Sequence, residues 1–141
     1  MKRTASAIWQ GALKDGKGTV STESGVLQHT AYSFGTRFEN GKGTNPEELV
    51  AAAHAGCFTM ALSAQLGERG LKPDRLETNA DLTFEKAESG WTITSIHLSV
   101  RGRVPGADAA AFDKAANAAK TGCPISRLLK TTITMDAKLE S

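Results

Sequence analysis

The stretch GTNPEELVAAAHAGC, residues 43–57, joins a well-marked helix start to a run of alanines that ends at a cysteine. Asn45 is suited to cap a helix, and Pro46 fits the first helical turn, where its missing N–H is not needed. Glu48, three residues after Asn45, completes a capping-box pattern, and both glutamates favour the positive end of the helix dipole. Glu47 has no other local role. The stretch predicts a helix that begins after Asn45 and carries Cys57 in its interior.

This helix is expected to continue through FTMALSAQLGERG, residues 58–70, until Gly70 and Pro73 stop it. Its apolar residues are spread around all faces, which is typical of a helix buried on nearly every side. They are Leu49, Val50, Ala51, Ala52, Ala53, Ala55, Phe58, Met60 and Leu62. One chain of 141 residues would struggle to surround such a helix, so we expect a second copy of the chain to supply part of its cover.

Short strands are predicted before the helix. Residues 4–13 (TASAIWQGAL) and 17–25 (KGTVSTESG) are strand-like segments joined by the turn KDGKG. Residues 29–38 (HTAYSFGTRF) continue the pattern, with Tyr32 and Phe34 alternating and Arg37 at the end of the segment. The pattern predicts an N-terminal antiparallel meander.

A strand pair and shorter helices are predicted after the long helix. Residues 75–104 form a hairpin around the turn AESG, with Leu82, Phe84, Ile93 and Ile96 facing inward. A helix over residues 105–122 is capped near Asp108 and closed by Gly122, a short helix begins at residues 123–130, and residues 131–140 form a closing strand. This order predicts one α+β domain over residues 1–141.

Composition excludes several classes of function. The 17 Lys and Arg residues against 15 Asp and Glu residues leave a net charge of +2, spread too evenly for a nucleic-acid surface. The start of the chain lacks the apolar segment of a secretion signal, and the stretch LVAAAHAGCF is too short to span a bilayer. We expect a cytoplasmic protein that binds neither nucleic acid nor membrane.

The two cysteines, Cys57 and Cys123, are 66 positions apart and form no CxxC pair, which argues against a permanent structural disulfide. Cys123 precedes Pro124 at the N-cap position of a short helix, where backbone N–H groups stabilise a thiolate. Cys57 is either a small buried apolar residue or a nucleophile. The cysteines are therefore inert thiols or a working pair.

A nucleophilic thiol needs a cation that holds it as the thiolate, and a carboxylate that holds the cation. Arg37 and Glu47 are candidates for these roles, although Arg37 is also explained as a snorkelling edge residue and Glu47 as a helix-dipole residue. Glu47 and Cys57 lie ten positions apart, about 15 Å along one helix, so they cannot meet within it. Antiparallel packing of two copies around Ala52 would bring Glu47 of one chain level with Cys57 of the other.

Three blocks carry a family resemblance: GKGTVSTESGVL (16–27), FGTRFENGKGTNPEELVAAAHAGCFTMALS (34–63) and AKTGCPISRLLK (119–130). They resemble the osmotically inducible protein C (OsmC) branch of the family of OsmC and organic hydroperoxide resistance (Ohr) proteins, over nearly the whole chain. The resemblance implies an intertwined homodimer with the long helices at its centre. It also implies thiol-dependent reduction of organic hydroperoxides, and of hydrogen peroxide less well, in defence against oxidative and osmotic stress.

Carried over by position, the resemblance makes Cys57 the peroxidatic cysteine and Cys123 the resolving cysteine. It makes Arg37 the residue that activates the thiolate and binds the peroxide, and Glu47 the residue that positions Arg37. No cofactor or metal is implied, and the reductant is expected to be a dihydrolipoyl-type or other dithiol. The apolar residues Leu49, Phe58 and Met60 are expected to favour peroxides with an organic tail.

Two other interpretations of the cysteines are open. His54 and Cys57 share one helix face and could form a zinc site with Cys123 and His97, although their spacing matches no common zinc pattern. Alternatively, the protein is a binding module for a small apolar ligand, with both cysteines as bystanders. The binding module predicts that Cys57→Ser retains function, whereas the peroxidase predicts its loss.

Overall fold

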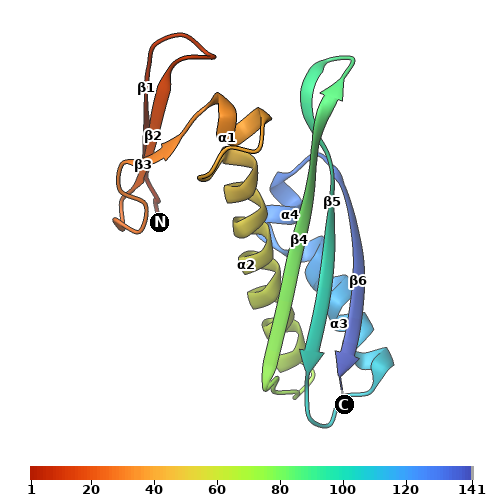
Figure 1. Cartoon of the computed structure of the whole chain (residues 1–141). Helices are drawn as coiled ribbons and strands as arrows, with labels where there is room; N and C mark the ends of the chain where they lie inside the picture. Colours follow the sequence, from red (N-terminus) through yellow and green to blue (C-terminus); the bar gives the residue numbers. More distant parts are fainter. Residues whose placement is uncertain (141) are drawn as a thin grey trace. The chain divides into compact units, whose positions relative to one another are not determined.

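The computed structural model describes residues 1–140, which form two compact units, one spanning residues 1–49 and the other beginning at Val50. The first unit holds an antiparallel sheet of strands β1 (Ala5–Gln10), β2 (Lys17–Thr22) and β3 (Thr30–Tyr32) in that order (Figure 1). Gly18 lies in register between Trp9 and Tyr32, and a Cβ there would come within 2.5 Å of the Tyr32 ring. The sheet confirms the predicted N-terminal meander.

The prediction that residues 29–38 form one strand is wrong. The strand ends at Tyr32, and a short helix, α1 (Phe34–Phe38), follows. Ser33 caps this helix, because its hydroxyl accepts from the Thr36 N–H while the Thr36 hydroxyl accepts from the Ser33 N–H. This capping box overrides the strand-like alternation, so that Arg37 lies on a helix instead of at a strand end.

The second unit contains a three-stranded sheet in the order β4–β5–β6. Strands β4 (Arg75–Ala87) and β5 (Gly90–Arg103) form the predicted antiparallel hairpin, and β6 (Thr132–Glu140) pairs parallel to β5. The crossover between β5 and β6 contains helices α3 (Ala109–Gly122) and α4 (Pro124–Leu128), with Asp108 as the predicted cap of α3. Two sheets and four helices confirm the α+β class.

Helix α2 (Pro46–Gly67) is the long helix, and it begins as predicted. The Asn45 side chain accepts from the Glu48 N–H at 2.8 Å, and the Glu48 carboxylate accepts from the Thr44 hydroxyl at 2.9 Å. The helix ends at Gly67, and Gly70, with φ of +71°, reverses the chain after it. The start and end signals of this helix were therefore readable from the sequence.

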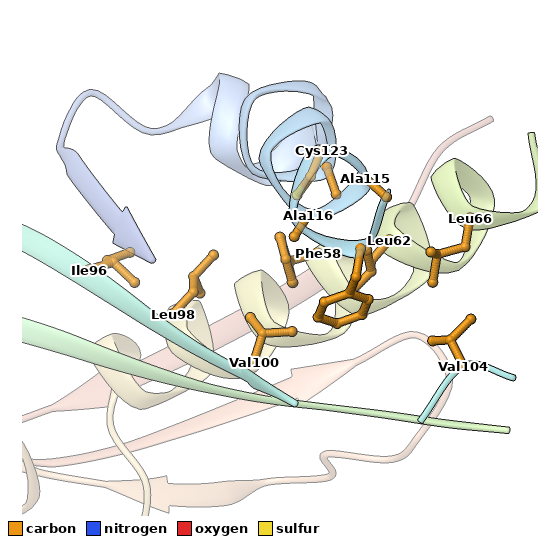
Figure 2. Close-up of a cluster of buried hydrophobic side chains, with 12 residues drawn as sticks. Phe58, Leu62, Leu66, Ile96, Leu98, Val100, Val104, Ala115, Ala116 and Cys123 are labelled. Atoms are coloured by element: carbon orange, nitrogen blue, oxygen red, sulfur yellow. The ribbon is translucent and has the colours of Figure 1, made fainter. Parts of the chain in front are cut away.

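The core of the second unit lies on one face of its sheet, because the buried side chains of β5 alternate along the strand. Figure 2 shows Leu98 and Val100 of β5 meeting Phe58 and Leu62 of α2 and the alanines of α3. The cluster comprises Phe58, Leu62, Leu66, Ile96, Leu98, Val100, Val104, Phe112, Ala115, Ala116, Ala119 and Cys123. Cys123 thus belongs to this core, and Cys57 packs against it.

Most of the inward positions predicted for the hairpin are confirmed. Ile96 is fully buried, and Leu82 and Ile93 pack against the core. Phe84 lies outside the core cluster and instead packs on Trp91, with ring centroids 5.1 Å apart. The strand register shifts between Thr83 and Phe84, where Thr94 of β5 has no partner on β4. Phe84 therefore remains part-buried on the same face of β4 as Leu82.

Burial of α2 on nearly every side is not found within one chain. His54, Phe58, Leu62 and Leu66 form one buried face, whereas Met60 remains 78 % exposed. Other small residues of the helix are also exposed, namely Ala52, Ala53, Gly56, Ser63, Ala64 and Gly67. By length and composition α2 would suffice to cross a membrane, contrary to the sequence expectation, but apolar core helices of soluble proteins share these properties.

Candidate active site

The two cysteines, far apart in the sequence, meet in the second unit. Cys57 lies on α2, Cys123 lies between α3 and α4, and their Sγ atoms are 3.0 Å apart. Cys123 is fully buried, Cys57 is partly buried, and both are free thiols. A disulfide bond requires about 2.0 Å between the sulfur atoms, so a small movement would join them.

Local structure explains the position of Cys123. Helix α3 ends at Gly122, and the Cys123 N–H donates to the Ala119 carbonyl at 2.9 Å, which closes the last turn. Pro124 then starts α4 at a position where the absence of an N–H costs nothing. Cys123 is thus the C-cap of α3 and the N-cap of α4. The sequence predicted its N-cap position.

Electrostatics distinguish the two thiols. Burial, and the hydrogen bond with Cys123, raise the pKa of Cys57 above its usual value. Burial alone would raise the pKa of Cys123 as well, but the bond with Cys57 and the dipoles of Ser126 and Ile125 outweigh it and lower that pKa. Cys123 Sγ makes no regular cap bond to an N–H, so these backbone groups act on it as nearby dipoles. Within this unit, Cys123 is therefore the more acidic of the two thiols.

A buried polar pair lies beside the thiols. His54 Nε2 is 2.8 Å from the Ser126 hydroxyl, and the two residues are 0 % and 8 % exposed. Sequence reasoning considered His54 as a possible zinc ligand, although such a residue is more often a core histidine, and it did not single out Ser126. Ser126 has no signal beyond its place three residues after Cys123. His97 instead lies 2.6 Å from the Thr134 hydroxyl, and no group of three or more possible metal ligands occurs within residues 1–140.

Arg37 and Glu47 are paired in the first unit. Arg37 Nε lies 3.0 Å and Nη2 2.7 Å from Glu47 Oε1, so the guanidinium donates twice to one carboxylate. Glu47 is buried, whereas the Arg37 side chain is 38 % exposed and lies over the Phe38 ring. Asn45 stabilises the connection, because its amide donates to the Thr36 carbonyl at 2.9 Å. The contact between the predicted cation and carboxylate is confirmed.

An aromatic pocket of about 240 Å³ lies beside Arg37 in the same unit. It is lined by Trp9, Leu13, Tyr32, Ser33, Phe34, Arg37 and Phe38. Sequence reasoning missed this pocket and named Leu49, Phe58 and Met60 as apolar neighbours of a substrate. Phe58 is wrong in that role, because its side chain is fully buried in the core. Trp9 is far in the sequence from the other aromatic residues of the pocket, and only the β-sheet brings it beside Tyr32.

The four predicted site residues therefore form two pairs, one in each unit: Arg37 with Glu47, and Cys57 with Cys123. Each pair has the contacts that its chemistry requires. That the two pairs act together as one active site, with the roles given above, stays a prediction.

Comparison with known proteins identifies the family of this chain. Residues 39–138 match the family described as OsmC-like protein. Peroxiredoxin OsmC of Escherichia coli (strain K12) is 53 % identical over 139 residues, which cover 99 % of this chain and 97 % of the relative. Organic hydroperoxide resistance protein OhrB of Bacillus subtilis (strain 168) is 30 % identical over 124 residues, covering 87 % and 88 % of the two chains.

Solved structures agree with the fold. The crystal structure of Bacillus subtilis OhrB matches with a TM-score of 0.68 and 25 % identity, over 97 % of this chain and 98 % of that one. An OsmC-like protein from Mycoplasma pneumoniae matches with a TM-score of 0.79 over 100 % and 99 % of the chains, and its 13 % identity supports the fold alone. A protein with this α+β fold and two adjoining thiols is a candidate two-cysteine redox protein. The chain belongs to the OsmC family.

The opposite pKa shifts of the two thiols lead to a testable titration. We expect the thiols of the reduced protein to ionise in two separate steps, because the first thiolate opposes the second. In Cys123→Ser, Cys57 loses the sulfur that raises its pKa and should ionise at lower pH than the second step of the wild type. The ultraviolet absorbance of thiolates during a pH titration measures both. One common step in the wild type, or no fall of the Cys57 pKa in the variant, would contradict this interaction between the two thiols.

Proposed function

We propose that the protein reduces organic hydroperoxides to alcohols through a Cys57 sulfenic acid and a Cys57–Cys123 disulfide, and hydrogen peroxide less well. The observation that carries this proposal is the 3.0 Å separation of the two sulfur atoms, one of them at a helix cap. A nucleophilic thiol and a resolving thiol must come this close for a disulfide to form without unfolding.

The protein is a cysteine-based peroxidase with a peroxide-detoxifying role. Its relatives bear the names Peroxiredoxin OsmC and organic hydroperoxide resistance protein, and the first is similar over nearly the whole chain. These names supply the reaction class, and the paired thiols supply the chemical means. The roles of individual residues go beyond the names and form the proposal.

In the first step, the Cys57 thiolate attacks the terminal oxygen of the hydroperoxide. The S–O bond forms as the O–O bond breaks, the alkoxide takes a proton to become the alcohol, and Cys57 becomes a sulfenic acid. The surroundings of Cys57 within its own unit raise its pKa, so a cation from elsewhere is needed at neutral pH. We assign this role to Arg37, which Glu47 holds through two hydrogen bonds.

In the second step, Cys123 attacks the sulfenic sulfur, and the hydroxyl group leaves as water. The disulfide is then reduced by exchange with a dithiol, of which a dihydrolipoyl group is the expected type. Every atom and electron is accounted for by the peroxide, the two thiols and this dithiol. No cofactor or metal is required.

The aromatic pocket supports an organic substrate. Its walls include Trp9, Phe34 and Phe38, and Arg37 is the cation in its lining. An apolar tail would gain from burial against these rings, while the peroxide group could be held by the guanidinium. Hydrogen peroxide has no tail to bury, which accounts for its expected lower efficiency.

The roles of the cysteines can be separated by mass and thiol count. After one equivalent of cumene hydroperoxide, the wild type should lose both thiols to an intrachain disulfide. Cys123→Ser should gain one oxygen and stop at the sulfenic acid, because no resolving thiol remains. Cys57→Ser should not react. Survival of both wild-type thiols would refute the proposal and favour a binding role with inert cysteines.

The role of Arg37 can be tested by its charge and shape. Arg37→Met should slow sulfenic acid formation at neutral pH by roughly a hundredfold, the usual loss when a positioned donor is removed. Arg37→Lys should recover only part of the rate, because an ammonium cannot donate twice to Glu47. Stopped-flow peroxide consumption measures this, with Arg69→Met as the control, since Arg69 donates to the carbonyl and side-chain oxygens of Gln65 and has no part in the proposed reaction. Equal rates in both methionine variants would exclude Arg37 from the reaction.

A homodimer is part of the proposal. The exposed face of α2 presents Ala52, Ala53 and Gly56 together with Met60, and small residues allow two helices to approach closely. Antiparallel packing through this face would cover the apolar side of α2 that one chain leaves open. We further propose a cytoplasmic location, without binding to nucleic acid or membrane.

We expect a dimeric mass at micromolar concentration in sedimentation equilibrium. Gly56→Arg should give monomers, because a long charged side chain would separate the two helices. Ala110→Arg, on an exposed turn of α3, is the matched control and should remain dimeric. A monomeric wild type at this concentration would contradict the dimer.

A further inference from the structure

His54 and Ser126 are buried polar residues that the proposed reaction does not yet use. His54 is fully buried on α2, Ser126 is 8 % exposed on α4, and their side chains are 2.8 Å apart. They join the two elements that carry Cys57 and Cys123. Buried polar groups are costly unless they are hydrogen-bonded, and apolar residues would fill the same space without that cost.

The surroundings of His54 indicate which ring nitrogen carries the proton. Nδ1 is buried and has no hydrogen-bond partner among the described residues, whereas Nε2 meets the Ser126 hydroxyl. Burial lowers the pKa of His54, which favours the neutral ring with a single N–H. An orphaned buried N–H is rarer than an orphaned acceptor, so the proton belongs on Nε2. Nε2–H then donates to Ser126 Oγ.

This donation orients the Ser126 hydroxyl. With its oxygen accepting from His54, the hydroxyl hydrogen is free to point elsewhere. Ser126 is the third residue of α4 after the cap, and a side chain at this position faces the cap residue, which here is Cys123. The Ser126 hydroxyl and backbone both act on the Cys123 sulfur. His54 thus contacts Ser126, Ser126 lowers the pKa of Cys123, and the Cys123 Sγ lies 3.0 Å from that of Cys57.

We propose that His54 is a positioning residue that, through Ser126, directs a hydrogen bond to Cys123 and keeps this thiol in the form that resolves the Cys57 sulfenic acid. This inference rests on the proposed two-cysteine reaction. The Cys123 thiolate attacks the Cys57 sulfur, the S–S bond forms, and the S–O bond breaks. The departing hydroxide takes up a proton equivalent to the one that Cys123 lost, and water leaves.

Other charged groups do not explain the state of Cys123. Burial raises the pKa of Cys123, and the bond with Cys57 on α2, together with Ser126 and Ile125 of α4, lowers it. The causes of this shift among residues 1–140 include no lysine or arginine. His54 is neutral in the proposed tautomer, so it acts through orientation and not through charge.

The first test measures Cys123 alone and does not depend on peroxide. In a Cys57→Ser background, thiolate absorbance is followed against pH with His54→Leu, His54→Gln and Ser126→Ala. Leucine removes the donor at similar volume, and the glutamine amide retains an N–H near the position of Nε2. We expect the Cys123 midpoint to rise with leucine and with alanine, and to return toward its starting value with glutamine.

The second test measures the reaction with both cysteines present. After mixing with cumene hydroperoxide, samples are quenched to count sulfenic acid and disulfide. At neutral pH, the rate of disulfide formation relative to sulfenic acid formation should fall about tenfold in His54→Leu and Ser126→Ala, matching the loss of one hydrogen bond to a charged group. The loss should shrink as pH rises, because alkali restores the thiolate.

Thr59→Val is the matched control, since it removes a side-chain hydrogen bond between α2 and Thr78 without touching His54 or Ser126. The inference would be overturned if the pKa midpoint of Cys123 were unchanged in His54→Leu and Ser126→Ala. It would also be overturned if disulfide formation slowed equally at every pH and slowed in Thr59→Val as well. A wild type that forms no sulfenic acid would instead refute the peroxidase, and the absorbance titration would still decide the role of His54.

Discussion

The approach of Cys57 to Cys123 depends on the packing of α2 and α3 on one face of the β4–β5–β6 sheet. Phe58, one residue after Cys57, is buried in the same core that contains Cys123. On the other side of this core, Phe112 fits against Gly102, where a Cβ would come within 2.6 Å of its ring. Because such interiors are close-packed, the two sulfur atoms cannot separate without disturbing the core. The chemistry of the thiols is therefore coupled to the stability of the second unit.

That same packing creates an electrostatic conflict. A dry core protects a sulfenic acid from water but disfavours the thiolate that must form it. The pKa of Cys123 is lowered by neighbouring groups, among them the backbone dipoles at the start of α4 and the Ser126 hydroxyl. Cys57, in the middle of a helix, has no comparable helix end, and its pKa is raised. A peroxidatic role for Cys57 thus demands a cation from another part of the protein. In the proposed reaction this cation is Arg37, to which Glu47 is hydrogen-bonded.

The sequence predicted those parts of the fold that depend on local chemistry. Asn45 and Asp108 indicated the starts of α2 and α3, and Pro124 indicated the start of α4. The turn at residues 87–90 indicated the hairpin of β4 and β5. It failed at α1, where the capping contact between Ser33 and Thr36 outweighs the alternation of apolar residues.

By itself, the sequence determined the α+β order of elements, the two reactive residue types and, through its motifs, the family. Caps, turns and alternation act over a few residues, so they leave a local record. Tertiary structure alone decided that His54 meets Ser126 and that Trp9, Tyr32 and Phe38 share a pocket. The contacts of His54 with Ser126 and of Trp9 with Tyr32 join residues far apart in the chain, and their distances depend on how whole elements pack. No short pattern of residues encodes such packing.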